Sequence, residues 1–247
     1  MKSINILFAL ILISFAVYGC QQSKENTSTN KKTRPPELVD GRYNVGILIM
    51  DGVYNTEMTA PMDIFQHTIF REGIKAMNVF LIAENLDVIT SFEGMRILPD
   101  YSFTDPNHPP IDILVVPSAE HHLDSDLENK IMIDWVGQTA AKAQYVTSHC
   151  DGAFVLAKAG ILNGVVSTTF PSDIPKYKEM FPQLDVRDEV MFVHDGKFIT
   201  SAGGARSFDG ALYLCELLYG KEVAQRLAQG LVIDWQLEEV KHIVVDK

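Results

Sequence analysis

The sequence is poor in cysteine and in positive charge, and it lacks several motifs by which functions are commonly recognised. Among its 247 residues there are three cysteines, and 21 lysines and arginines stand against 32 aspartates and glutamates, for a formal net charge of −11. That balance argues against nucleic acid as a partner, because nucleic-acid-binding proteins present clustered Lys and Arg. No tandem repeat, glycine-rich phosphate loop or zinc-spaced Cys/His cluster is visible.

The first twenty residues, MKSINILFALILISFAVYGC, are predicted to be a processing segment. Lys2 supplies positive charge, and the apolar run 6–17 is too short for a comfortable membrane span. The run ends in Val-Tyr-Gly-Cys at 17–20, which resembles the lipobox of bacterial lipoproteins. We therefore expect a lipoprotein signal peptide over 1–19 and lipidation of Cys20; a plain signal peptide or a short anchor is the alternative.

The polar stretch that follows has the composition of a flexible linker. It carries lysines and a Pro-Pro pair, and we assign residues 20–42 to the lipidated N-terminus and linker. Residues 43–247 then form one α/β domain, since 47% hydrophobic residues are enough for a single sizeable core. The expected location is the cell envelope, with a lipid anchor holding the domain on the periplasmic or surface side of a bacterial membrane.

Apolar runs of strand length alternate with helical segments along this domain. Near-continuous apolar runs are typical of strands buried on both faces of a parallel sheet. We expect strands at 43–50, 77–84, 88–91, 95–98, 111–117, 145–148 and 164–169, and a hairpin of strands 186–193 and 197–201. We expect helices around Pro61, at 127–142 and 152–159, and from Ser207 and Glu222, and a helical or irregular piece at 172–182. This alternation predicts a doubly wound, mostly parallel sheet flanked by helices, with sites at the carboxyl ends of its strands.

Cys150 lies where the strand 145–148 turns into the helix 152–159. One interpretation is packing, because free cysteine behaves as a small buried hydrophobe. The other is catalysis, because a tight strand-to-helix turn aims backbone N–H groups and a helix N-terminus at its apex and favours a thiolate. Cys215 lies on the apolar face of a helix and is predicted to be core. A disulfide between the two cysteines is the alternative.

Four motifs give the chain a resemblance to a known family. They are 50-MDGVYNTEMTAPMDIF-65, 112-DILVVPSAE-120, 147-TSHCDGAFVLAKAGILNGVVSTT-169 and 195-DGKFITSAGGARSFDGALYL-214. In this order they resemble the PfpI superfamily, to which the parkinsonism-associated deglycase belongs. The nearest resemblance is to isonitrile hydratases and to the amidase-like sensor domains of AraC-type regulators. The resemblance implies a flavodoxin-like fold of the class I glutamine amidotransferase type.

The resemblance also implies roles for particular residues. Cys150 matches the nucleophile, and Glu57 matches the acidic residue that lies against it and can exchange a proton with it. The alternative for Glu57 is a solvated acid at a helix N-terminus. The backbone N–H groups of Ala119 and Asp151 match the oxyanion-binding positions.

Two departures from the family pattern bear on the chemistry. Asp151 stands where isonitrile hydratases have Thr and intracellular proteases of the family have His. Its charge should raise the pKa of Cys150; facing the pocket it would take a catalytic role on water, and facing solvent it would only cap a helix. Phe170, a candidate pocket residue, stands where many relatives have His, so no Cys–His dyad is evident.

The remaining candidates are histidines. His121 and His122 follow the oxyanion loop and either line the pocket or are solvated, whereas His149 is assigned a structural role because neighbours on a strand face opposite sides. The sequence predicts no metal site and no cofactor.

Three functions remain open. The first is a cysteine-dependent hydrolase or hydratase that acts on a small electrophile, as isonitrile hydratases do. The second is a non-catalytic ligand-binding or sensor module of the same fold, and the third is a redox-responsive thiol protein. The apolar helices after Gly164 and Ser207 favour a homodimer.

Overall fold

The computed structural model describes residues 35–245. The predicted signal peptide over 1–19, Cys20 with its lipidation, and residues 20–34 of the predicted linker lie outside the described residues. The described end of that linker contacts the domain, because Val39 donates its N–H to Asn78 Oδ1 and accepts a hydrogen bond from Asn78 Nδ2, both at 3.1 Å. Within 35–245, no helix is long and apolar enough to cross a membrane.

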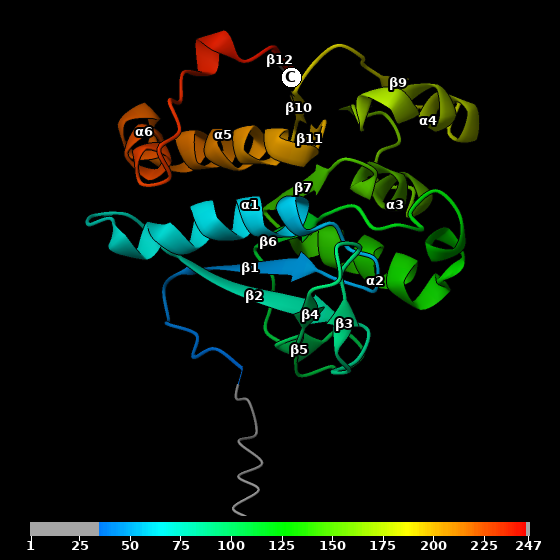
Figure 1. Cartoon of the computed structure of the whole chain (residues 1–247), viewed down its shortest axis with the longest axis horizontal. Helices are drawn as coiled ribbons and strands as arrows, with labels where there is room; N and C mark the ends of the chain where they lie inside the picture. Colours follow the sequence, from blue (N-terminus) through cyan, green and yellow to red (C-terminus); the bar gives the residue numbers. More distant parts are fainter. Residues whose placement is uncertain (1–34, 246–247) are drawn as a thin grey trace, which may run out of the picture. The chain divides into compact units, whose positions relative to one another are not determined.

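An eight-stranded sheet runs through the described domain in the order β12-β10-β11-β7-β6-β1-β2-β5 (Figure 1). Its strands are β1 (Tyr43–Leu48), β2 (Met77–Ala83), β5 (Tyr101–Ser102), β6 (Ile113–Val116), β7 (Tyr145–His149), β10 (Phe192–Asp195), β11 (Phe198–Ser201) and β12 (His242–Val245). Every pairing is parallel except the β10–β11 hairpin. The predicted mostly parallel, doubly wound fold is confirmed.

Helices cover both faces of this sheet (Figure 1). One face carries α1 (Asn55–Gln66), α5 (Ser207–Tyr219) and α6 (Lys221–Gln229), and the other carries α2 (Lys130–Lys142) and α3 (Gly152–Lys158), with α4 (Ile174–Met180) adding to the second core. Strand alternation divides the side chains of β1 between the two cores: Val45 and Ile47 join the first, and Leu48 joins the second. Both faces are therefore apolar, which explains the near-continuous apolar runs in the sequence.

Shorter elements complete the domain. They are the antiparallel pair β3 (Ile89–Thr90) and β4 (Arg96–Ile97), the parallel pair β8 (Val166–Ser167) and β9 (Asp185–Val186), and the 3₁₀ helices η1 (His67–Phe70), η2 (Ser125–Glu128), η3 (Pro171–Asp173), η4 (Gly204–Arg206) and η5 (Leu237–Glu239). The single strand predicted over 186–193 is wrong. Glu189 adopts a φ of 57°, which interrupts the extended chain, so β9 pairs with β8 and β10 begins only at Phe192.

Candidate active site

Loops from the carboxyl ends of four strands meet around Cys150. The loop after β1 leads into α1 and brings Glu57, and the loops after β6 and β11 bring Ser118 and Gly204. Glu57 joins these loops, because its Oε2 accepts the Ser118 N–H at 3.0 Å and its Oε1 accepts the Gly204 N–H at 3.1 Å. Cys150 itself follows β7 and donates its N–H to Ser201 O at 3.0 Å. The site thus lies at the carboxyl end of the sheet, as predicted.

The turn at Cys150 is a strained elbow. Its φ of 53° lies in the left-handed region, which costs a residue with a side chain on the order of 1–3 kcal/mol. Two glycines allow the elbow to pack closely. A Cβ at Gly152 would lie 2.0 Å from Val116 O, and one at Gly203 would lie 2.2 Å from the Cys150 Cβ. The strand-to-helix turn predicted from the sequence is therefore present and is held by neighbouring backbone.

Glu57 occupies the first turn of α1 and is only 4% exposed, so it is not the solvated acid of the alternative interpretation. The helix begins at Asn55, earlier than the sequence suggested, with Pro61 inside it. Pro61 has no N–H to donate to the Glu57 carbonyl four residues earlier. Burial raises the pKa of the Glu57 carboxyl, and the N–H groups of Gly204 and Ser118 and the Cys150 thiol oppose that rise.

The electrostatics of the thiol differ from those expected of an isolated elbow. Burial, followed by the negative charges of Glu57 and Asp151, raises the pKa of the Cys150 thiol, whereas the Asp151 N–H acts in the opposite direction. The thiol is 6% exposed. It is therefore protonated at rest, and its single hydrogen can be donated either to the Glu57 carboxyl or to Asp151 Oδ2, which lies 3.6 Å from the sulfur. The sequence correctly indicated that Asp151 raises this pKa, but the helix N-terminus does not produce a resting thiolate.

Asp151 turns its carboxyl inward. It occupies the N-cap position of α3, yet its side chain makes no capping hydrogen bond, and the residue is 7% exposed. Its Oδ1 lies 3.0 Å from Thr169 Oγ1, and its Oδ2 lies 3.6 Å from the Cys150 sulfur. Burial, followed by the charge of Asp173, raises the pKa of Asp151 to about 7. Of the two sequence interpretations, the carboxyl that faces the site is the one the structure shows.

The two predicted oxyanion donors lie in different surroundings. Ala119 forms an antiparallel bridge with Val53, and the hydrogen bonds of this bridge run from Tyr54 N to Ser118 O and from Glu120 N to Gly52 O. Neither of them uses the Ala119 N–H. The Asp151 N–H acts on the Cys150 sulfur. The Asp151 N–H therefore lies where it can stabilise negative charge on the sulfur, and the Ala119 N–H is not used by the bridge.

The candidate pocket residues occupy different environments. His121 is exposed and lies 3.2 Å from Asp124, whereas His122 is fully buried, with Nε2 3.2 Å from Met50 Sδ and its ring next to the Asp151 main chain. Burial lowers the pKa of His122 to about 3, so its ring is neutral. Phe170, which directly follows Thr169, is 38% exposed.

His149 and Cys215, which were assigned structural roles from the sequence, are both buried. His149 places Nδ1 2.9 Å from Ser201 Oγ. Cys215 lies inside α5, and both it and Cys150 are free cysteines, so the alternative disulfide is not formed. Among residues 35–245, no group of three or more His, Cys, Asp or Glu side chains could hold a metal ion.

Several residues of the site were not assigned from the sequence. Thr169, Gly203 and Gly204 contact the catalytic candidates, and Tyr54 lies close enough to Cys150 for their charges to interact. The Gly-Gly pair was the visible signal. Nothing in the sequence alone indicated that this pair would meet Cys150 and Glu57, which come from two other segments of the chain.

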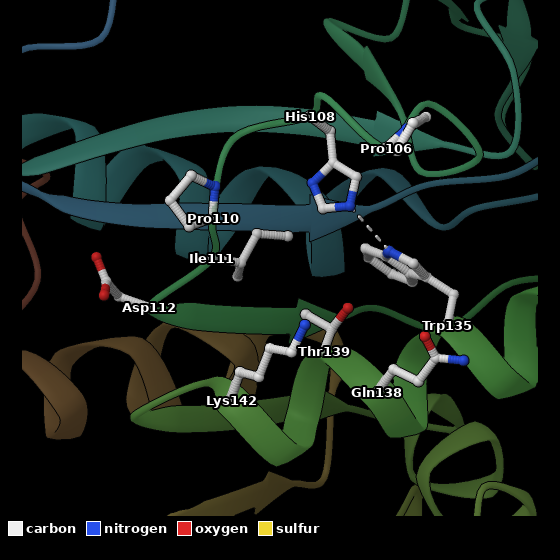
Figure 2. Close-up of a pocket in the computed structure, with 9 residues that line it drawn as sticks. All are labelled: Pro106, His108, Pro110, Ile111, Asp112, Trp135, Gln138, Thr139 and Lys142. Carbon is white, nitrogen blue, oxygen red and sulfur yellow. Dashed lines mark hydrogen bonds between the residues drawn. The ribbon is translucent and has the colours of Figure 1, made fainter.

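A separate hollow of about 390 Å³ lies at the other end of the sheet (Figure 2). Asp112 immediately precedes β6, and Lys142 ends the helix that leads to β7, so the hollow borders the amino ends of these strands. In Figure 2 the rings of His108 and Trp135 meet, with Trp135 Nε1 3.4 Å from His108 Nε2. None of its lining residues belongs to the Cys150 site.

Fold and site together define a class: a doubly wound α/β domain with a cysteine at a nucleophile elbow and a buried carboxyl beside it. The model of the DJ-1/PfpI family matches residues 43–217, and the chain belongs to this family. The suspected superfamily is thereby confirmed. Members of the family are commonly dimeric and bind small molecules.

Individual relatives agree with this assignment. The chain is 31% identical to an isonitrile hydratase of Pseudomonas putida over 184 residues, which cover 73% of this chain and 74% of that protein. It is 26% identical to dj-1beta of Drosophila melanogaster over 187 residues, covering 76% and 95% of the two chains. The crystal structure of an AraC family transcriptional regulator from Pseudomonas putida superposes with a TM-score of 0.66 at 19% identity, covering 76% and 99%. That last likeness concerns the fold.

These relatives contradict the predicted lipoprotein and its place in the cell envelope. The curated proteins that match include an isonitrile hydratase and DJ-1 proteins, and they provide no support for a signal peptide over 1–19, a lipidated Cys20 or a membrane partner. Those predictions are wrong. They rested on one apolar run and a motif of four residues, which carry little information compared with a match over 43–217.

Proposed function

We propose that this protein is a cysteine-dependent hydrolase or hydratase of a small electrophilic molecule. In this proposal Cys150 is the nucleophile, Glu57 accepts its proton, and the N–H groups of Ala119 and Asp151 stabilise negative charge. The observation that carries the proposal is the thiol buried against a carboxyl whose two oxygens accept the Ser118 and Gly204 N–H groups. Such a carboxyl is fixed in place and is available as a base.

A thiol with a raised pKa is suited to this role if deprotonation accompanies attack. The sulfur needs no resting charge when the base lies beside it, because the proton moves to Glu57 as the sulfur–carbon bond forms. A resting thiolate, by contrast, is what a redox-responsive cysteine requires. The raised pKa of Cys150 therefore favours the enzyme over the redox protein.

Similarity to an isonitrile hydratase suggests a specific reaction. The sulfur would bond to the terminal carbon of an isonitrile, and the thiol proton would pass through Glu57 to that carbon, giving a thioimidate. Water would then add to the same carbon, and the carbon–sulfur bond would break. One water proton would end on nitrogen and the other on sulfur, so the products are an N-substituted formamide and the restored thiol.

The second candidate is a ligand-binding or sensor module. Two observations favour it. Cys150 is only 6% exposed, which limits the access of a substrate to the sulfur, and the fold is similar to that of an AraC family regulator. In that case the pocket would bind a small molecule without turnover.

Turnover with matched cysteine variants separates the two candidates. Purified protein is incubated with alkyl isonitriles, and the formamide is quantified by chromatography for wild type, Cys150→Ala, Glu57→Gln and the control Cys215→Ala. We expect activity in wild type and the control, none in Cys150→Ala, and a loss of about 100- to 10,000-fold in Glu57→Gln. Saturable isonitrile binding by calorimetry with no product in wild type would instead support the sensor module.

The homodimer stays a proposal. The inner face of α5, which begins at Ser207, is buried in this chain's own core, so only its outer residues, such as Leu217, are available to a partner. Light scattering at tens of micromolar would show twice the chain mass for a dimer and the chain mass of 27.6 kDa for a monomer.

A further inference from the structure

One hydroxyl near the elbow contacts two oxygens. Thr169 Oγ1 lies 3.0 Å from the Cys150 main-chain oxygen and 3.0 Å from Asp151 Oδ1. A threonine hydroxyl has a single hydrogen to donate and can also accept. The three oxygens are buried together, so the position of each proton in this group matters to its energy.

Counting donors identifies the protonation in which both contacts of Thr169 Oγ1 are hydrogen bonds. The Cys150 carbonyl can only accept, and its other donor, Ala153 N, is distant at 3.4 Å. If Thr169 donates to the carbonyl, then the contact with Asp151 Oδ1 is a hydrogen bond only when Asp151 is protonated and donates to Thr169. If Asp151 is ionised, Thr169 can donate to it, but then two lone pairs face each other 3.0 Å apart at the carbonyl.

The surroundings of Asp151 also favour the neutral acid. The groups that face it are Glu57 from α1, Asp173 from η3, the Cys150 thiol and the Tyr54 phenol, and none of them is a cation. The neutral His122 ring lies beside its main chain. Burial, followed by the charge of Asp173, raises the pKa of Asp151 to about 7, and a hydrogen bond donated to its carboxylate by Thr169 or by the Cys150 thiol acts in the opposite direction without cancelling that rise.

Glu57 is in the opposite situation. Its two oxygens accept backbone N–H groups, which favour the carboxylate, whereas the Asp151 side chain contacts no backbone donor and has as partners only the Thr169 hydroxyl at 3.0 Å and the weakly donating Cys150 thiol at 3.6 Å. Glu57 and Asp151 both lie near the Cys150 sulfur, and their environments favour different protonation states. Such a pair can divide the roles of base and acid, with the ionised carboxylate as the base and the neutral carboxyl as the acid.

We infer that Asp151 carries a proton in the resting site and is its proton donor, and that Thr169 is the positioning residue that holds it there. This inference rests on the proposed hydratase. During hydrolysis of the thioimidate, the Asp151 proton passes to nitrogen as the water oxygen bonds to carbon. The water proton returns to the Asp151 carboxylate, so the acid is regenerated before the carbon–sulfur bond breaks.

The direction of a pKa change tests the position of the Thr169 proton. Infrared difference spectra of wild type against Asp151→Asn, recorded from pH 5 to 9 without substrate, follow the carbonyl band of the protonated carboxyl. We expect that Thr169→Val lowers the pKa of Asp151 by about one pH unit, the equivalent of one hydrogen bond to the neutral acid. Thr169→Ser, which keeps the hydroxyl, should retain the wild-type value.

Opposite results would overturn the inference. A rise in the pKa of Asp151 in Thr169→Val would show that the hydroxyl donates to an ionised carboxylate, and a missing carbonyl band at neutral pH in wild type would show that Asp151 is not protonated. Circular dichroism melting confirms that both threonine variants fold, and Thr169→Ala, which also lacks the hydroxyl, carries the test if Thr169→Val does not fold.

Kinetics test the donor role separately. With an alkyl isonitrile, kcat should fall at alkaline pH in wild type, and this limb should move to lower pH in Thr169→Val. Asp151→Asn should lower kcat by about 100-fold or more and abolish the limb. An unchanged kcat in Asp151→Asn would refute the donor. Absence of turnover in wild type would refute the proposed function, while the infrared result would still decide the protonation of Asp151.

Discussion

Replacing Asp151 with Asn should make the protein more stable at alkaline pH. The pKa of this carboxyl is about 7 in the folded protein against an ordinary value of 3.8. Because the folded-state value is raised, folding is favoured most below pH 3.8, where the carboxyl is neutral in both states. That advantage declines as the pH rises and is lost above about 7.

The size of the effect follows from the same values. Each pH unit between 3.8 and about 7 corresponds to about 1.4 kcal/mol, so ionisation of Asp151 costs the folded protein roughly 4 kcal/mol. This figure is an upper limit for two reasons. Part of it comes from the charges of Glu57 and Asp173, which can themselves take up protons, and rearrangement of the site around an ionised Asp151 lowers the cost. An Asn side chain occupies nearly the same volume and does not ionise, so the variant escapes this cost.

Urea denaturation measures the difference. The free energy of unfolding is determined for wild type and Asp151→Asn at pH 4, 5.5, 7 and 8.5, with the exposed Asp87→Asn as a control. We expect the stability of Asp151→Asn relative to wild type to increase by several kcal/mol from pH 4 to 8.5, and the control to follow wild type. A difference that stays constant over this range would refute the reasoning about the buried carboxyl.

Two further predictions concern the backbone around the site. Gly203→Ala places a Cβ 2.2 Å from the Cys150 Cβ, so it should lower the free energy of unfolding by more than about 3 kcal/mol or prevent folding. Gly204→Ala has no atom within 4 Å of its Cβ and should lower it only by the roughly 1–2 kcal/mol that a left-handed backbone costs a residue with a side chain. Equal urea midpoints for the two variants would contradict this. Thr68→Val removes the hydroxyl that accepts Met77 N at 2.9 Å and should cost about 1–3 kcal/mol, with Thr68→Ser as the control that keeps the bond.

The parts of the fold that the sequence predicted are those set by local pattern. The apolar run at β1 and the change from strand to helix at Cys150 are visible in consecutive residues, and both are confirmed. The stretch 186–193 was misassigned because the backbone turn at Glu189 leaves no signature in side-chain type. The edge strand β12 was missed because it is short and pairs with β10, far away in the sequence.

Prediction of the site was limited by long-range contacts. The family resemblance placed Cys150 and Glu57, and the structure brings them together. Thr169 and Gly204 could not be assigned, because their roles depend on which loops meet after folding. The direction of the Asp151 side chain was equally open, since a residue at the start of a helix can face solvent or the site.

Mass spectrometry of the acid-quenched protein during turnover tests the central claim most directly. With an excess of an alkyl isonitrile, the account predicts that the mass of one isonitrile molecule is added to the peptide that contains Cys150. Glu57→Gln should reduce the rate of this addition, and Asp151→Asn should let the adduct accumulate, because hydrolysis of the thioimidate is slowed. Formamide production with Cys150 unmodified at every quench time, and undiminished in Cys150→Ala, would contradict covalent catalysis by this cysteine.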